Sequence, residues 1–319
     1  MPETTVALAI ANGVKREVGK VIVGMGESIE SLLIAFLTGG HVIMEGIPGL
    51  AKTLLAKSFA MSLGLRFKRI QFTSDILPSD IIGGLVFNRR SGELEFRPGP
   101  IFANIVLIEE IYRAPPRSQS ALLEAMQERQ VTVEGVSYSL PDPFLVVATQ
   151  NPVELEGTFP LPEAELDRFM MRVIVPYPTA EEERMILEMK NILGEEVPVS
   201  PAVDLEAVRV AMDEVRNVVV VPEVINYIVD VVSTSRRDSR LVLGASTRAE
   251  IALLYAAKAH AALSGRMYAT PDDVKKVFFR VLNHRLQPKP EFSGLSKTPD
   301  YSFLSKILKE YLDSVEVPL

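Results

Sequence analysis

Short apolar runs alternate with segments of helical periodicity through the first half of the chain. Because parallel strands need a long, usually helical, crossover between them, this alternation predicts a largely parallel sheet covered by helices. The first half is therefore expected to be an α/β domain. Five runs are the candidate strands: Val42–Met44, Phe67–Phe72, Ile105–Ile108, Phe144–Thr149 and Arg172–Val175.

Two segments of alternating residues interrupt this rhythm. Residues Gly84–Gly99 alternate about a turn at Ser91-Gly92, and residues Val131–Leu140 alternate about Glu134-Gly135. A glycine turn between alternating runs is typical of a β-hairpin. Both segments are predicted to be hairpins inserted into the α/β pattern, and loops held on a rigid scaffold often carry function.

The pattern changes after the proline-bearing stretch Pro176–Thr179. Apolar residues then recur at helical spacing, and a linker at Leu286–Pro299 precedes the last amphipathic segment. We expect an α/β domain over residues 1–178 and a smaller all-helical domain over residues 179–319. The predicted helices of the second domain are Glu181–Leu193, Leu205–Val215, Glu223–Ser235, Arg248–Ser264, Pro271–Val281 and Phe303–Val315.

The composition excludes or disfavours several kinds of functional site. None of the 319 residues is a cysteine, so disulfides, thiolate metal sites and cysteine nucleophiles are excluded. His41, His260 and His284 share no ligand spacing, and a structural role is expected for each. The net charge of −7, from 34 basic and 41 acidic residues, argues against a broad affinity for nucleic acid but not against a local basic patch.

No membrane segment is expected. The apolar stretch near residues 31–44 is interrupted at Thr38–His41, and a membrane span needs about 20 apolar residues. The N-terminus has no basic region followed by an apolar core, so no secretory signal is expected either. Cytoplasm is the expected location.

Residues 46–53, with the sequence GIPGLAKT, are the main candidate for chemistry. They follow the apolar run Val42–Met44 and open a helical pattern over Thr53–Leu63. A strand, a glycine loop and a helix in this order form a phosphate cradle, because backbone N–H groups converge where the helix dipole favours an anion. Lys52 is expected to reach the outer phosphates, and Thr53 to offer its hydroxyl to Mg²⁺. The alternative is a Gly-Pro turn before a surface helix.

One position departs from the G-x-x-x-x-G-K-[ST] pattern of such loops. Ala51 stands where the last glycine is expected. Alanine is acceptable there if the residue already has helical dihedrals, which an L-residue adopts without strain. The cradle is therefore expected to be intact.

The segment IVLIEEI at Ile105–Ile111 is an apolar run that ends in two carboxylates. Ligands bind at the carboxyl ends of strands in open parallel sheets, where Glu109 and Glu110 would lie. In nucleotide hydrolases the first such acid orients Mg²⁺ and the second polarises the attacking water. Two solvated acids at a strand end are the alternative. Aspartate is usual in the metal position, so the extra methylene of Glu109 predicts looser metal geometry and slow turnover.

Two polar residues of the first domain are candidates for contact with a γ-phosphate. Asn151 follows an apolar strand and could hydrogen-bond the phosphate or the water, although turn chemistry also explains it. Arg168 lies just before the last strand and could neutralise transition-state charge in a neighbouring subunit. Local pairing of Arg168 with Asp167 or Glu165 is the alternative.

Arg248 is the candidate from the second domain. Thr247 and Glu250 have the spacing of a capping box, which puts Arg248 in the first turn of a helix. The helix macrodipole disfavours a cation there, so an anionic partner such as a phosphate is expected. An exposed arginine that tolerates this small cost is the alternative.

Five segments together resemble the MoxR family of AAA+ ATPases. In chain order they are GIPGLAKT, FTSDILPSDIIGG, FRPGPIFANIVLIEEIYRAPPRSQSALLEAMQERQVTVEG, ATQNPVELEGTFPLPEAELDRF and GASTRAE. The resemblance covers residues 10–285. It implies an α/β fold, the AAA+ P-loop αβα sandwich, with a C-terminal all-helical lid domain. A helix-2 insert within residues 75–99 and a pre-sensor-1 hairpin at residues 131–140 are also implied.

The resemblance implies a role for each candidate residue. Glu109 and Glu110 would be the Walker B pair, Asn151 sensor 1, Arg168 the arginine finger and Arg248 sensor 2. Thr53 and Glu109 would hold the metal, and the cofactors would be ATP or ADP and Mg²⁺. The Walker A residues, in which Ala51 fits the family's own variant, would be Gly46, Ile47, Pro48, Gly49, Leu50, Ala51, Lys52 and Thr53.

The chain departs from the family where MoxR proteins usually read D-E-I-N-R-A. Glu109 replaces the aspartate, and Tyr112 replaces an amide, so any role of that amide is not carried over. The last residues, beyond about 285, match no motif of the family.

Three functions are weighed. The first, implied by the resemblance, is an Mg²⁺- and ATP-dependent ring ATPase that acts as a chaperone-like remodelling, assembly or maturation factor. Its ring would be a homo-oligomer, with six subunits implied, and its client protein is often encoded nearby. The second is an ATP-controlled assembly scaffold with little hydrolysis, which Glu109 suggests.

The third function is a nucleic-acid motor. Such a motor is expected to present Lys or Arg at the tip of the pre-sensor-1 hairpin, where this chain has Glu134-Gly135. The acidic net charge also argues against it. Arg89 and Arg90 on the other hairpin are basic, so the nucleic-acid motor is kept as an alternative. The sequence identifies neither the client nor a role for the last residues.

Overall fold

A five-stranded parallel sheet forms the centre of the first half, with the strand order β2-β5-β8-β1-β9. The computed structural model describes residues 5–152, 158–194, 198–292 and 301–318. All five predicted strands are confirmed, each with ends within one residue of the prediction. Their bounds are β1 Val42–Glu45, β2 Phe67–Gln71, β5 Ile105–Glu109, β8 Leu145–Gln150 and β9 Met171–Ile174.

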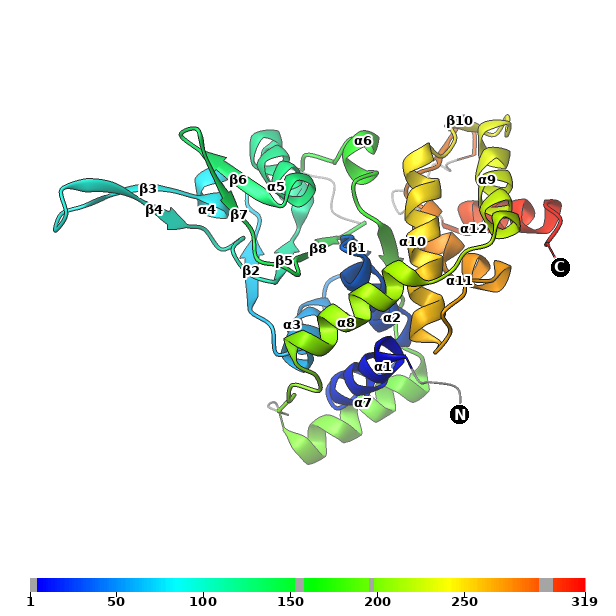
Figure 1. Cartoon of the computed structure of the whole chain (residues 1–319), viewed down its shortest axis with the longest axis horizontal. Coiled ribbons are helices and arrows are strands. Elements are labelled where there is room, and N and C mark those ends of the chain that lie inside the picture. The colour runs from blue at the N-terminus through cyan, green and yellow to red at the C-terminus, as the bar shows by residue number, and fades with distance from the viewer. Residues whose placement is uncertain (1–4, 153–157, 195–197, 293–300, 319) are drawn as a thin grey trace.

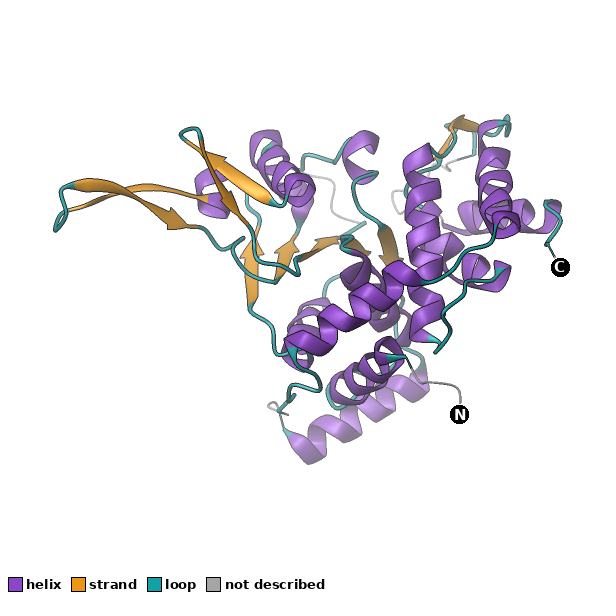
Figure 2. Ribbon diagram, in the orientation of Figure 1, coloured by secondary structure: helices purple, strands orange, loops and turns teal. Residues whose placement is uncertain are grey.

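Both faces of this sheet are covered (Figures 1 and 2), which explains why its inner strands read as unbroken apolar runs. Successive side chains point to opposite faces. Ile105 and Leu107 therefore pack in one core cluster with α3 (Lys52–Ser62), whereas Val106 and Ile108 pack in a second cluster with α5 (Pro116–Glu128).

Two N-terminal helices complete the first core cluster. They are α1 (Val6–Val18) and α2 (Gly26–Thr38), for which the apolar pattern led to no prediction. Their buried residues share one continuous cluster with α3 and with helices of the second half of the chain. The division into domains at residue 178 stays a prediction.

The two predicted hairpins are confirmed and project from the same end of the molecule (Figure 1). One pairs β3 (Gly83–Asn88) with β4 (Glu93–Pro98), after the short helix α4 (Pro78–Ile82). The other pairs β6 (Gln130–Val133) with β7 (Val136–Ser139). At its turn both Glu134 and Gly135 have positive φ, at 47° and 80°, as a two-residue type I′ turn requires.

The second half of the chain is mainly helical, as predicted. One correction concerns a two-stranded antiparallel sheet, β10 (Leu241–Leu243) with β11 (Gln287–Pro288), whose second strand lies in the predicted linker. Residues 293–299 of that linker lie outside the described residues. The helices are α7 Ala180–Leu193, α8 Leu205–Asn217, α9 Pro222–Arg236, α10 Thr247–Leu263, α11 Pro271–Leu282 and α12 Tyr301–Ser314.

The last helix, α12, packs firmly on the rest of the helical half. Its buried face includes Ile307 and Tyr311, and the Tyr311 hydroxyl donates to Asp238 at 2.7 Å. An ion pair also joins Arg240 to Glu310 on α12 at 2.8 Å. These contacts fix α12 to the turn between α9 and β10.

Asp273 is a buried carboxylate between α10 and α11. It is 1% exposed and accepts from Arg266 at 2.6 Å and 2.8 Å, and His260 lies 2.6 Å away. Although burial opposes ionisation, these partners hold its pKa well below the usual range. His41 is also structural: its Nδ1 accepts from the Val146 N–H at 3.0 Å, and its Nε2 lies 3.2 Å from the Met126 carbonyl.

No helix in the described part of the chain is long and apolar enough to cross a membrane.

Candidate functional site

The glycine loop connects the end of β1 to the start of α3, as the sequence predicts. The Lys52 ammonium lies in the loop and donates to the carbonyls of Gly46 and Ile47 at 2.6 Å and 2.7 Å. Burial lowers the pKa of Lys52, while the charges of Glu109 and Glu110 act in the opposite direction. A perturbed lysine in a loop of this shape is suited to binding an anion.

Ala51 does not have the right-handed helical dihedrals that an alanine would adopt without strain. Ala51 has φ 53° and ψ 21°, which is left-handed rather than right-handed helical backbone. An alanine Cβ crowds the backbone in this conformation, and glycine avoids that cost. The loop nevertheless closes onto α3, because the Leu55 N–H donates to the Ala51 carbonyl at 2.9 Å.

Glu109 ends β5 and is 9% exposed. One of its carboxylate oxygens accepts from the hydroxyl of Thr53, and the other accepts from the guanidinium of Arg69. The two residues expected to hold a metal are therefore in direct contact. Arg69 lies on β2 and was not anticipated as part of the site.

Glu110 lies immediately beyond β5 in a left-handed conformation, with φ 56°. Its backbone N–H donates to the Thr149 hydroxyl at 3.1 Å. Its carboxylate accepts from the Gln71 amide at 2.7 Å and pairs with Arg113 at 3.1 Å. A left-handed glutamate held by this many partners is a strained residue of the kind that clusters at active sites.

The loop, both acids and Asn151 line one cavity of about 520 Å³. Asn151 is 9% exposed and lies just past β8, next to β5 in the sheet. The cavity lies at the carboxyl ends of β1, β5 and β8, as expected for a ligand site in an open parallel sheet. Gln71 also lines it and was missed, because nothing in the sequence places β2 beside β5.

The donor atoms of this cavity fit Mg²⁺. Thr53 and Glu109 offer hard oxygen ligands close enough to share one cation, and Mg²⁺ typically takes few protein ligands beside water and phosphate. Among the described residues, no cluster of three or more His, Cys, Asp or Glu side chains forms a dedicated metal cage.

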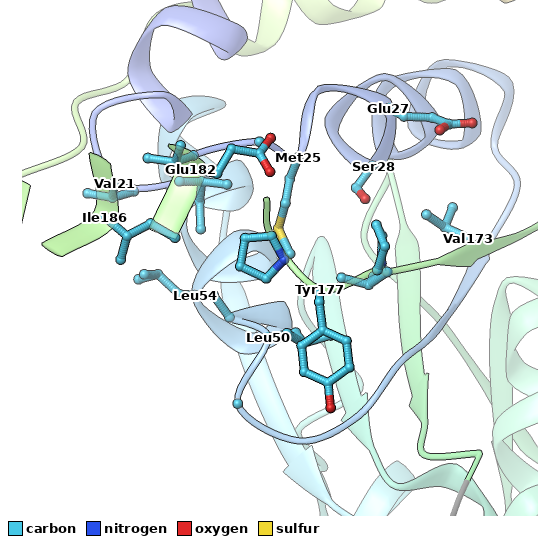
Figure 3. Close-up of a pocket in the computed structure, with 18 of the residues that line it drawn as sticks. Val21, Met25, Glu27, Ser28, Leu50, Leu54, Val173, Tyr177, Glu182 and Ile186 are labelled. Carbon is cyan, nitrogen blue, oxygen red and sulfur yellow. The ribbon is translucent and has the colours of Figure 1, made fainter. Parts of the chain in front are cut away.

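A second, mainly apolar cavity of about 260 Å³ adjoins the other side of the loop. Figure 3 shows Met25, Leu50, Leu54 and Ile186 around this space, with Tyr177 at its edge. The run Val21–Met25 between α1 and α2 contributes much of the wall. This pocket was not predicted from the sequence, in which its wall shows only as an apolar run between two helices.

Arg168 and Arg248 do not line either cavity. Arg168 follows the short helix α6 (Glu163–Leu166), and neither Asp167 nor Glu165 forms an ion pair with it in the described structure. Asp167 is instead held by Arg285 at 2.6 Å and by Arg248 at 3.4 Å. The alternative of local pairing at Arg168 is therefore wrong.

The predicted capping box of α10 is also wrong. Ser246, not Thr247, is the N-cap residue, with no side-chain capping bond, and Glu250 pairs with Arg236 at 2.5 Å. Arg248 does lie in the first turn, and the anionic partner that its position called for is Asp167. Since Asp167 precedes Arg168, this pair links the helical half to the segment that carries Arg168.

A buried ionic cluster lies directly behind the glycine loop. Glu45, the residue before Gly46, is 2% exposed, and burial raises its pKa. It pairs with Arg172 on β9 at 3.5 Å and accepts a hydrogen bond from the hydroxyl of Tyr301, the first residue of α12. The C-terminal helix thereby contacts the strand that leads into the loop.

The two hairpins present apolar side chains to solvent. Phe96 of β4 stacks on Tyr138 of β7 with ring centroids 3.8 Å apart, which ties the hairpins together. Farther out, Phe87 and Leu94 are 59% and 62% exposed. Exposed apolar side chains on a projecting element are typical of an interaction surface.

Comparisons with known proteins match the chain to two family models and to several relatives. The model of the ATPase family associated with various cellular activities (AAA) matches residues 41–171, and that of the AAA lid domain matches residues 233–302. The chain is 42% identical to the uncharacterized protein YeaC of Bacillus subtilis, over 95% of this chain and 93% of that protein.

Two further relatives carry the MoxR name. The chain is 42% identical to the chaperone MoxR1 of Mycobacterium tuberculosis, over 85% of this chain and 74% of that protein. It is 31% identical to the protein MoxR of Methylorubrum extorquens, over 90% of each. The crystal structure of a putative ATPase from Cytophaga hutchinsonii superposes with a TM-score of 0.87 at 40% identity, covering 98% of this chain and 97% of that one.

Proposed function

The chain belongs to the MoxR family of AAA+ ATPases, and from this we propose that it binds and hydrolyses ATP in an Mg²⁺-dependent way to remodel or assemble partner proteins. The observation that carries the proposal is the cavity shared by the glycine loop, Glu109, Glu110 and Asn151. The apolar pocket on the other side of the loop is suited to the base, because it is concave and largely apolar.

Each residue of the cavity has a part in this reaction. The loop N–H groups and Lys52 would bind the phosphates, for which Lys52 would exchange two carbonyl partners for phosphate oxygens. Glu110 would polarise the attacking water, and Gln71 and Arg113 hold its carboxylate in place. When bound to Thr53 and Glu109, Mg²⁺ would neutralise charge on the phosphates.

A complete site would need a second copy of the chain. Arg168 lies away from the cavity of its own chain, which suits a residue that acts on the γ-phosphate of a neighbour in a ring. Arg248 would join the segment of Arg168 to the helical half through Asp167. A hexamer is the ring size that the family resemblance implies.

The partner would be a protein. One relative is named a chaperone, and the exposed Phe87 and Leu94 are suited to contact apolar segments of a client. The hairpins would move against the client as nucleotide is hydrolysed. A nucleic-acid motor is the weaker proposal, because the second hairpin turns at Glu134-Gly135.

Replacement of Glu110 by Gln tests the proposed reaction. The Glu110→Gln variant is expected to bind ATP as the parent does but to lose turnover, because an amide cannot accept the proton of the attacking water. ATP binding and phosphate release are measured on both proteins. Hydrolysis at the parent rate would contradict the role of Glu110, and the ATP-trapped variant would also serve to capture a client.

The scaffold alternative rests on Glu109, whose carboxylate has one methylene more than aspartate. The Glu109→Asp variant discriminates between the two functions. A large rise in ATP turnover would favour a scaffold that assembles on ATP without hydrolysing it quickly. An unchanged rate would show that the extra methylene of Glu109 does not slow ATP hydrolysis.

A further inference from the structure

Arg69 occupies the carboxylate that the proposed function assigns to the metal. Arg69 lies on the edge strand β2 and donates to Oε2 of Glu109 on the neighbouring strand β5, while Thr53 donates to Oε1. The strand register accounts for this contact, because Gln71 pairs with Glu109 and Arg69 lies two residues earlier on the same face. Both oxygens of Glu109 therefore have partners within the chain.

The two members of this ion pair differ in exposure. The side chain of Arg69 is 53% exposed, whereas that of Glu109 is 11% exposed. An exposed arginine leaves an ion pair for water at little cost, but a buried carboxylate stripped of its partner is left uncompensated. Of the two, Arg69 is the side chain that can be displaced.

We propose that Arg69 competes with Mg²⁺ for Glu109 and thereby sets the metal affinity of the nucleotide site. This inference rests on the proposed function, since it concerns the same metal position. Two cations on one carboxylate repel each other, so the guanidinium must leave Oε2 or lose part of its bond when a metal is bound. Arg69 is a positioning residue in this account.

Arg69 also has a neutral partner that remains after displacement. The terminal nitrogen that pairs with Glu109 also lies 3.4 Å from the Gln71 side-chain oxygen. When a metal displaces it from Glu109, the arginine would keep this contact and turn toward water. It does not line the phosphate cavity, so it is not a phosphate ligand in this arrangement.

The test is a metal titration of nucleotide binding. Binding of a fluorescent ADP analogue is measured as a function of Mg²⁺, and binding of Mn²⁺ in the presence of ADP is measured by electron paramagnetic resonance. Arg69→Gln is expected to lower the Mg²⁺ and Mn²⁺ midpoints roughly three- to tenfold, as loss of a competing charged hydrogen bond implies. Arg69→Lys keeps the positive charge but loses the planar guanidinium, so its midpoints should lie between those of the parent and those of Arg69→Gln.

Lys68 provides the matched control. It is an exposed cation on the same strand, its side chain points to the other face, and it forms no ion pair with a described residue. Lys68→Gln removes the same charge and should leave the midpoint within about twofold, because exposed charges at a distance are screened. Circular dichroism of each variant confirms that the fold is retained.

Three results would overturn the proposal. Midpoints that are unchanged or raised in Arg69→Gln would show that Arg69 does not compete with the metal. Loss of ADP binding in the absence of metal would show that Arg69 contacts the phosphates instead. A parent protein that binds no nucleotide would refute the proposed function and this inference together, whereas the first two results refute this inference alone.

Discussion

The left-handed conformation of Ala51 makes the glycine loop a measurable source of strain. Replacing Ala51 by glycine restores the residue that such loops usually carry at this position. The conformation costs an alanine about 1–2 kcal/mol. Glycine avoids that cost but loses roughly 0.4–1 kcal/mol more in conformational entropy on folding. The net expected gain in the free energy of unfolding is about 0.5–1 kcal/mol.

For a chain of this length the gain corresponds to a rise in Tm of roughly 1–3 °C. Differential scanning calorimetry of the parent and of Ala51→Gly measures it directly. ADP affinity should stay close to that of the parent, because the loop backbone already has the conformation that the glycine would adopt.

Two matched variants separate backbone strain from other effects. Gly49 has φ 86°, and a Cβ there would meet nothing within 4 Å, so Gly49→Ala should cost about 1 kcal/mol from backbone conformation alone. Ala56 lies in the middle of α3, and Ala56→Gly should cost at least about 1 kcal/mol. If Ala51→Gly lowered Tm as Ala56→Gly does, the assignment of left-handed strain to Ala51 would be refuted.

Three further predictions concern buried polar groups. Asp273→Asn should lower the free energy of unfolding by about 2–4 kcal/mol, because the arginine and histidine partners of Asp273 lose their anion. Calorimetry measures the change, and Asp272→Asn at the neighbouring exposed carboxylate is the control. Burial lowers the pKa of His41 to about 3 from its ordinary value of 6.5, so the free energy of unfolding is highest above pH 6.5 and falls as the pH falls, by about 2 kcal/mol at pH 5. His41→Gln should flatten that part of the Tm–pH curve. Tyr301→Phe removes the hydroxyl that donates to buried Glu45 and should cost about 1–3 kcal/mol in a urea titration, and an unchanged midpoint would exclude the contact as a support for α12.

The strands of the sheet could be predicted because they are buried on both faces and so read as apolar runs. The loop and the acids of the site could be predicted for a related reason. Gly46–Thr53, Glu109 and Asn151 each come shortly after such a run, and the carboxyl ends of parallel strands meet at one edge.

Residues brought to the site by strand register could not be predicted in this way. Arg69 and Gln71 lie on a strand of mixed polarity, and only the pairing of β2 with β5 places them beside Glu109 and Glu110. Tyr301 reaches Glu45 from 256 residues away, beyond the reach of any local pattern. The dihedrals of Ala51 were equally hidden, because loop closure sets them rather than residue type.

In the proposed ring, each complete site combines one chain's Glu110 with its neighbour's Arg168. Mixing two variants that are each expected to be inactive, Glu110→Gln and Arg168→Ala, tests this sharing of the site between subunits. In mixed rings some sites have an intact Glu110 from one chain and an intact Arg168 from the next, so ATP hydrolysis should return to about a quarter of the parent rate in a random equal mixture. A mixture that stays as inactive as its two components would contradict the account.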